Sequence, residues 1–186
     1  MILQDNSLLV FILGFLILAV AFNLWLTFRL IRAIRLLPIQ KAPVQNLEAG
    51  TQLSNVTLQR ITDKEPATLH AYPEHAKVLV FLTSKCNKCK SKLPELRTSL
   101  EKAHEMGVII WIVTLEAKRR MKRFLQDESL LQATMSADQS GYDYLNPQGA
   151  SPYYLFIDSE NTLQAEGFIG DENWAGFMEQ LKEGEA

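Results

Sequence analysis

The chain has 186 residues, a formal net charge of −2 and only two cysteines. The small negative charge excludes a general electrostatic affinity for nucleic acid, and two cysteines exclude a framework of several disulfides or a zinc site of four thiolates. When an apolar N-terminal segment and a linker are set aside, roughly 130 residues remain, enough for one domain with its own core.

Residues 8–28 carry no charge, and a helix of this length spans the hydrocarbon core of a bilayer. A cleaved signal peptide is the alternative, but the run is longer than a signal h-region and no basic segment precedes it. Arg29, Arg32 and Arg35 then recur at three-residue steps, which predicts that the helix continues out of the bilayer and ends before Pro38.

These features predict three parts. Residues 1–37 form a transmembrane helix with an amphipathic exit, residues 38–52 form a linker, and residues 53–186 form one domain. The positive-inside rule alone places the arginine-bearing side, and with it the domain, in the cytoplasm.

The domain alternates between strand-like and helix-like patterns. The predicted elements are, in chain order, a lead-in hairpin within 53–69, a strand over 77–83, a helix over 86–106, a strand over 108–114, a helix over 116–126, a strand over 130–135, a turn-rich stretch over 136–149, a hairpin of strands 153–158 and 163–168, and a last helix capped by Asp171. This order predicts an α/β domain with a central mixed sheet flanked by helices.

The sequence Cys86-Asn87-Lys88-Cys89 lies where the strand predicted over 77–83 passes into a helix. Two thiols one helical turn apart can form a disulfide, and a helix N-terminus together with the cations of Lys85 and Lys88 stabilises a thiolate. We therefore predict that Cys86 is an exposed nucleophile with a lowered pKa and that Cys89 is the buried resolving thiol. A pair with a stabilised thiolate is more oxidising.

Two basic stretches accompany the motif. Lys90 and Lys92 follow it, and the helix predicted over 116–126 is basic on most of its surface. Solubility of a helix end accounts for the lysines near the motif. A solvated face accounts for the charges of the helix over 116–126, and docking to an acidic partner or a lipid surface is the alternative for that helix.

Two prolines complete a wider pattern: Pro94 lies inside the helix that follows the motif, and Ser151-Pro152 directly precedes the strand that begins at Tyr153. With this order of features, residues 53–181 resemble the thioredoxin superfamily. The resemblance implies a cis bond before Pro152 and a docking groove shaped by Ser151 and Pro152. Tyr153 directly follows Pro152, and two roles are open for it: packing, or contact with a docked substrate because Tyr is enriched at interfaces.

The anchor, the hairpin and the extra strand–helix segment resemble the membrane-anchored branch of that superfamily, which includes cytochrome c maturation thioredoxins and the methylamine utilisation thiol–disulfide proteins. This resemblance places the domain on the outer side of a bacterial cytoplasmic membrane, against the charge rule. The chain departs from the pattern at Lys85, where thioredoxins usually carry Trp, and at Val80, where they carry a buried Asp.

The sequence thus predicts a single-pass membrane protein that acts as a thiol–disulfide oxidoreductase on protein disulfides, needs no external cofactor and is recycled by a separate redox partner. Two alternatives stay open: a membrane-held Cu(I) metallochaperone that uses both thiolates, and a non-catalytic binding module. A Cys2His2 metal site with two of His70, His75 and His104 is disfavoured by the irregular spacing of these residues, so no metal site is predicted.

Overall fold

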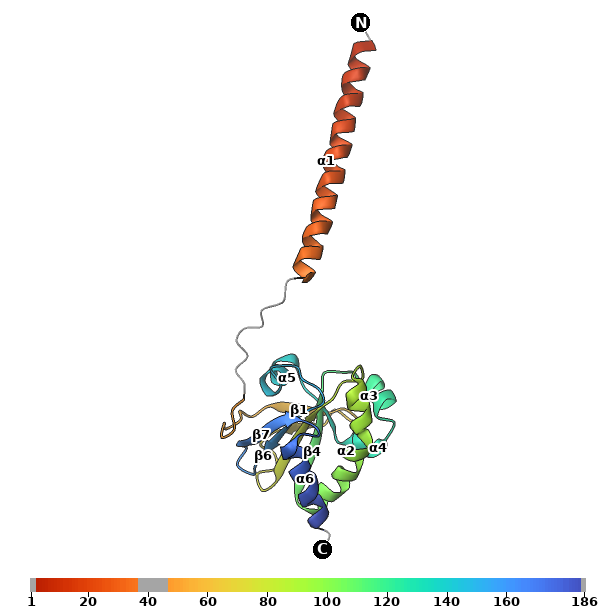
Figure 1. Ribbon diagram of the computed structural model, residues 1–186. Helices are drawn as coiled ribbons and strands as arrows, with labels where there is room; N and C mark the ends of the chain where they lie inside the picture. The colour runs from red at the N-terminus through yellow and green to blue at the C-terminus, as the bar shows by residue number, and fades with distance from the viewer. Residues whose placement is uncertain (1–2, 37–46, 185–186) are drawn as a thin grey trace. The chain divides into compact units, whose positions relative to one another are not determined.

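The computed structural model of the chain describes residues 3–36 and 47–184 (Figure 1). The chain divides into two compact units, one from Met1 to Pro43 and one from Val44 to Ala186. Residue 37, the last of the predicted amphipathic exit, and most of the predicted linker lie outside the described residues.

The first unit contains a single helix, α1, over Leu3–Leu36. Within it, Val10–Leu30 is long and apolar enough to cross a membrane by length and composition. Every side chain in that stretch is exposed, and the Arg29 guanidinium lies 5.2 Å from the ring centre of Trp25, a cation–π distance. The predicted N-terminal apolar helix is confirmed.

The second unit is built on one seven-stranded mixed sheet in the order β2-β1-β5-β4-β3-β6-β7. Strands β3, β4 and β5 are parallel, and the other pairings are antiparallel. The strands are β1 (Thr57–Arg60), β2 (Pro66–Thr68), β3 (Ala76–Phe81), β4 (Val108–Thr114), β5 (Thr134–Ser136), β6 (Tyr153–Ile157) and β7 (Leu163–Phe168). The helices are α2 (Asn87–Glu105), α3 (Lys118–Leu125), α4 (Glu128–Gln132), α5 (Gln139–Leu145) and α6 (Glu172–Glu183).

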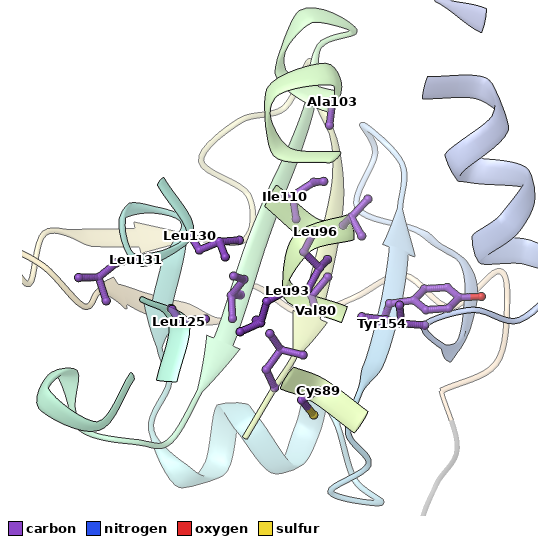
Figure 2. Packing of buried hydrophobic residues seen from close by; sticks show 14 of the residues in the cluster. Val80, Cys89, Leu93, Leu96, Ala103, Ile110, Leu125, Leu130, Leu131 and Tyr154 are labelled. Carbon is purple, nitrogen blue, oxygen red and sulfur yellow. The ribbon is translucent and has the colours of Figure 1, made fainter. Parts of the chain in front are cut away.

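Both faces of the sheet are covered by other elements. Side chains along a strand alternate between the faces, so neighbouring residues of β3 belong to different cores. Val78 and Val80 of β3 belong to a core that α2, α3, α4 and α6 close, part of which Figure 2 shows. Leu79 and Phe81 belong to a second core with α5 and the segment that leads into β1. This coverage explains why β3 is a continuous apolar run in sequence.

Two predictions for the middle of the domain are wrong in detail. Residues 130–135 are not one strand, because α4 occupies their first half and only β5 is extended. The turn-rich stretch contains helix α5. Both helices begin at an aspartate cap, with Asp127 accepting from Leu130 N at 3.0 Å and Asp138 accepting from Gly141 N at 2.7 Å.

Residues 47–52, which the sequence places in the linker, pack on the domain. Leu47 is buried, and Gly50 N donates to Leu163 O at 2.7 Å. Gln52 forms a β-bridge with Thr162. The apolar side chain and the backbone partners bring this segment into the folded unit.

One edge of the sheet gathers segments from three strands. The carboxyl ends of the parallel strands β3 and β4 lie there, and so does the start of β6, because Phe81 at the end of β3 pairs with Tyr153. The motif cysteines, the residues after β4 and Pro152 therefore meet at this edge.

Candidate redox site at the carboxyl edge of the sheet

Cys86 lies between the end of β3 and the first turn of α2. It is the N-cap residue of α2, and its own backbone N–H donates to Thr83 O at 3.1 Å. An N-cap sulfur faces the free N–H groups of the first helical turn, where negative charge is stabilised. The loop and the first turn of α2 therefore hold the Cys86 sulfur where a thiolate is stabilised.

The two thiols have different surroundings. Cys89 is fully buried, whereas Cys86 is half-buried, and both are free in this structure. Figure 2 places Cys89 in the core beside Val80 and Leu93. Cys89 N donates to Cys86 Sγ at 3.1 Å, so the two residues are held one turn apart with only the first open to a partner.

These surroundings separate the acidities of the thiols. Burial tends to raise the pKa of Cys86, but hydrogen bonds from the Cys89 side chain and backbone outweigh it and leave that pKa below its ordinary value. Burial raises the pKa of Cys89 to about 11, and the neighbouring Cys86 adds to the rise. Cys86 is therefore the thiol that ionises first, which makes it the better nucleophile.

Lys85 and Lys88, the predicted thiolate-tuning residues, are exposed. What lowers the pKa of Cys86 is a set of hydrogen bonds, and Lys88 takes part through its backbone N–H. The ammonium groups of both lysines act from solvent, where salt screens them.

The segment before β6 faces Cys86. The Ser151–Pro152 peptide bond is cis, as the resemblance implies, and Cys86 Sγ donates to Ser151 O at 3.6 Å. Buried Asn146 fixes this segment by two hydrogen bonds to the backbone of Ala150, at 2.8 and 2.9 Å. The predicted groove residues Ser151 and Pro152 therefore lie next to the nucleophile.

Tyr153 has the packing role that is one of its two expected roles, because it is only 6% exposed and its hydroxyl donates to Glu166. Its ring packs between Phe81 and Phe168. Phe168 is 56% exposed and lies opposite Tyr153 on the neighbouring strand, so it offers an exposed apolar surface next to the buried Tyr153.

Sequence reasoning missed Glu116, which follows β4 by two residues. Its carboxylate accepts from Thr83 Oγ1 at 2.7 Å, from Ser84 N at 2.8 Å and from Ser84 Oγ at 2.6 Å. Burial tends to raise the Glu116 pKa, but these hydrogen bonds outweigh it and lower that pKa. Since Thr83 also binds the backbone of Cys86, the carboxylate holds the loop that carries the nucleophile. The sequence could have indicated Glu116 because it follows the second of two strands expected to be parallel, and parallel strands end at the same edge of a sheet.

Pro94 lies within α2, which continues through it to Glu105. The next residue, Glu95, pairs with Lys92 Nζ at 3.0 Å and accepts from Trp174 Nε1 at 2.7 Å. These contacts tie α2 to α6 and so support the helix whose first turn holds the thiols.

His70, one of the three histidines considered for a metal, has a structural partner in Leu53 O at 3.1 Å. Across residues 3–36 and 47–184, the structure brings no three His, Cys, Asp or Glu side chains together in a metal-binding group.

With this geometry in view, a family model described as "AhpC/TSA family" matches residues 49–166. The chain belongs to the AhpC/TSA family. The match covers the lead-in hairpin, the cysteine motif, Glu116 and Pro152, so the candidate site falls within the family's own extent. A comparison with curated proteins gave no match.

Solved structures that resemble this AhpC/TSA member confirm the thioredoxin-like α/β fold. A thiol:disulfide interchange protein from Bacteroides sp. is 15% identical with a TM-score of 0.61, over 73% of this chain and 91% of that one. A thiol:disulfide interchange protein DsbE from Chlorobium tepidum is 19% identical with a TM-score of 0.58, over 75% and 98%. Mycobacterium tuberculosis AhpC is 12% identical with a TM-score of 0.53, over 75% and 94%. At these identities the likeness concerns the fold.

Proposed function

We propose that this AhpC/TSA-family protein is a membrane-tethered thiol–disulfide oxidoreductase that acts on protein disulfides through Cys86 and Cys89. The observation that carries the proposal is the pairing of a half-buried N-cap thiol of lowered pKa with a buried thiol of raised pKa, next to Ser151 and Pro152. The resemblance to cytochrome c maturation and methylamine utilisation proteins supports a role in maturing an envelope protein.

The exchange reaction follows from this asymmetry. The Cys86 thiolate attacks one sulfur of the partner's disulfide, forms a mixed disulfide and releases the other partner sulfur as a thiolate. Cys89 then loses its proton and attacks Cys86 Sγ, which frees the second partner thiolate and closes the Cys86–Cys89 disulfide. Two electrons pass from the dithiol to the partner, and the reverse sequence oxidises a partner dithiol. A separate redox protein returns the pair to its starting state.

The backbone beside Cys86 suits an extended partner. Ser151 O lies 3.6 Å from the Cys86 sulfur, and Ser151 is half-buried, so a polypeptide running past the nucleophile passes beside this backbone. Phe168 adds an exposed aromatic surface on the neighbouring strand. These features support docking of a protein rather than of a small thiol.

Trapping tests the mechanism. Replacing the resolving thiol, Cys89→Ser, leaves the mixed disulfide without an internal attacker, so an adduct with the partner accumulates and disappears on reduction. The matched control is Cys86→Ser, which retains one cysteine but lacks the nucleophile and forms no adduct. Equal adducts from both variants, or none from Cys89→Ser, would contradict the proposed roles. Stoichiometric Cu(I) binding without disulfide turnover would favour the metallochaperone.

The tether is proposed from α1, whose apolar stretch is exposed along its described length and needs lipid to cover it. The predicted outer location is tested with a membrane-impermeant thiol reagent on reduced, intact cells. Labelling of Cys86 before the cells are opened supports that side, and labelling only after opening places the domain in the cytoplasm.

A further inference from the structure

A hollow of about 500 Å³ opens directly beside the redox motif. Its wall includes Ser84 and Asn87, which lie within two residues of Cys86, and four cationic side chains. These are Lys85 and Lys90 from the start of α2 and Arg120 and Arg123 from α3. We refer to these six residues as the basic hollow.

Three of the four cations in the basic hollow have no ion-pair partner in the part of the chain that the structure describes. No carboxylate lines the hollow, and among residues 3–36 and 47–184 no ion pair involves Lys85, Lys90 or Arg123. Arg120 lies 3.7 Å from Glu116, but that carboxylate already accepts three hydrogen bonds from the loop before the motif. Because the whole chain has a net charge of −2, four cations around one hollow are a local concentration.

The packing of α2 and α3 determines which basic side chains line the hollow. Lys118 also lies on α3, but its ammonium donates to Thr62 O at 2.6 Å, and Arg119 and Lys122 do not line the hollow. The two basic stretches noted in the sequence therefore meet only through Lys85, Lys90, Arg120 and Arg123. Like charges held close together repel, and such a surface is stabilised by an anionic occupant.

We propose that the basic hollow binds an acidic segment of the polypeptide whose disulfide Cys86 attacks. This inference rests on the proposed function and names the partner chemistry for the same site. A protein partner is favoured over lipid because the hollow adjoins the nucleophile, which the partner's chain must reach. Four cations on two helices match several carboxylates along one extended segment. Their attraction raises the rate of encounter, an effect that salt weakens.

The test uses the reduced full chain in neutral detergent and two synthetic peptides. Each peptide carries one cysteine as a mixed disulfide with thionitrobenzoate, and they differ only in four flanking residues, which are Glu in one and Gln in the other. Cys86 attacks the peptide sulfur and thionitrobenzoate leaves, after which Cys89 releases the peptide thiol. We expect the Glu peptide to react about tenfold faster at low salt, with the ratio falling toward one at high salt.

Two double variants with the same change in charge separate a built site from net charge. K90E together with R123E lies in the basic hollow, and R119E together with K122E lies elsewhere on α3. The first pair should bring the Glu/Gln rate ratio to about one, while the second pair keeps most of it. The Gln peptide gives the exchange rate of each protein without peptide carboxylates, so the ratio within one protein, and not the absolute rate, is compared. Equal losses in both pairs, or a ratio of one in the unaltered chain, would overturn the proposal.

Failure of the hollow is distinguishable from failure of the exchange chemistry. If the Gln peptide does not react at all, the proposed function fails, and fluorescence anisotropy of a Glu peptide with Ser in place of Cys still measures binding. Tighter binding of that peptide than of its Gln counterpart, lost in the K90E and R123E pair, supports the hollow by itself. If α3 is protected from hydrogen exchange in nanodiscs containing phosphatidylglycerol and the peptides bind equally, lipid is the occupant and the proposal is wrong.

Discussion

The two edges of the central sheet both bury polar groups, but they use them differently. At the amino edge of β3, Lys77 is 1% exposed, and its ammonium donates to His75 O and to Asn161 Oδ1, each at 3.1 Å. A cavity of about 490 Å³ lies there, lined largely by apolar side chains such as Phe156 and Phe177. At this edge, the chain satisfies its own buried groups.

At the carboxyl edge, the partly buried carboxylate of Glu116 is also satisfied, and its partners belong to the loop that presents Cys86. The half-buried Cys86 thiol has a lowered pKa and lies beside the basic hollow, where three of the four cations have no ion-pair partner among the described residues. Burial and a shifted pKa therefore do not by themselves identify a reactive site. Cys86 differs from Lys77 because its sulfur is half-buried and stays open to a partner molecule.

The largest expected effect is the loss of disulfide exchange on replacing Cys86, and the same replacement should hardly change stability. Cys86→Ala should reduce disulfide exchange about a thousandfold or more, because it removes the attacking sulfur. Its free energy of unfolding should change by less than about 1 kcal/mol, since the side chain is half-exposed. Stopped-flow exchange and urea denaturation measure the two effects, and residual exchange within tenfold would assign the attack to another group.

At the amino edge of β3, a replacement should lower stability and leave disulfide exchange unchanged. Lys77→Ala removes a buried aliphatic stem and leaves Asn161 Oδ1 without its donor, which should lower the free energy of unfolding by about 3 kcal/mol. Exchange per folded molecule should be unchanged. The exposed Lys182→Ala serves as control, with an effect within about 0.5 kcal/mol in urea denaturation. A loss of exchange in the folded Lys77 variant would mean that the two edges are coupled.

Glu116→Gln should lower the free energy of unfolding by about 1–2 kcal/mol at neutral pH, because charge-assisted hydrogen bonds to Thr83 and Ser84 are lost. The folded pKa of Glu116 is lowered, so its contribution is present above the unfolded pKa and is lost as the pH falls through the folded pKa. The two proteins should therefore converge in stability in acid, as urea denaturation at several pH values can measure. A pH-independent difference would show that the carboxylate charge is not what holds the loop.

The smallest effects concern the two thiols of the reduced chain. Alkylation of Cys86 by iodoacetamide should rise with pH and reach half its maximum below about 8.5, the ordinary thiol value, because the thiolate is the reacting form. Cys89 should react only as the pH approaches about 11. Mass spectrometry of the alkylated peptides separates the two sites.

Lys85→Ala together with Lys88→Ala tests the lysine contribution to the same profile. Since backbone hydrogen bonds lower the Cys86 pKa and both ammonium groups are exposed, the midpoint should rise by only about 0.3 pH units. A rise of a full unit would support the thiolate-tuning role that the sequence predicts for both lysines.

Much of the fold was determined by patterns that are local along the chain. The apolar run of β3, the helical spacing after Cys86 and the aspartate cap of α6 each depend on residues within a few positions of one another. The cysteine motif and Pro152 also identify the fold without any knowledge of contacts. By contrast, the short helices α4 and α5 were missed, because their caps are single aspartates in otherwise strand-like or turn-like surroundings.

What only the tertiary structure decided is which distant residues meet. Glu116 reaches Thr83 and Ser84 because β3 and β4 are parallel and end at one edge, which no local pattern records. Tyr153 is buried under Phe168 because the β6–β7 pairing places them opposite each other. The basic hollow forms because packing brings the start of α2 beside α3. Spacing along the chain encodes periodicity and caps, whereas packing across it determines which charges remain without partners.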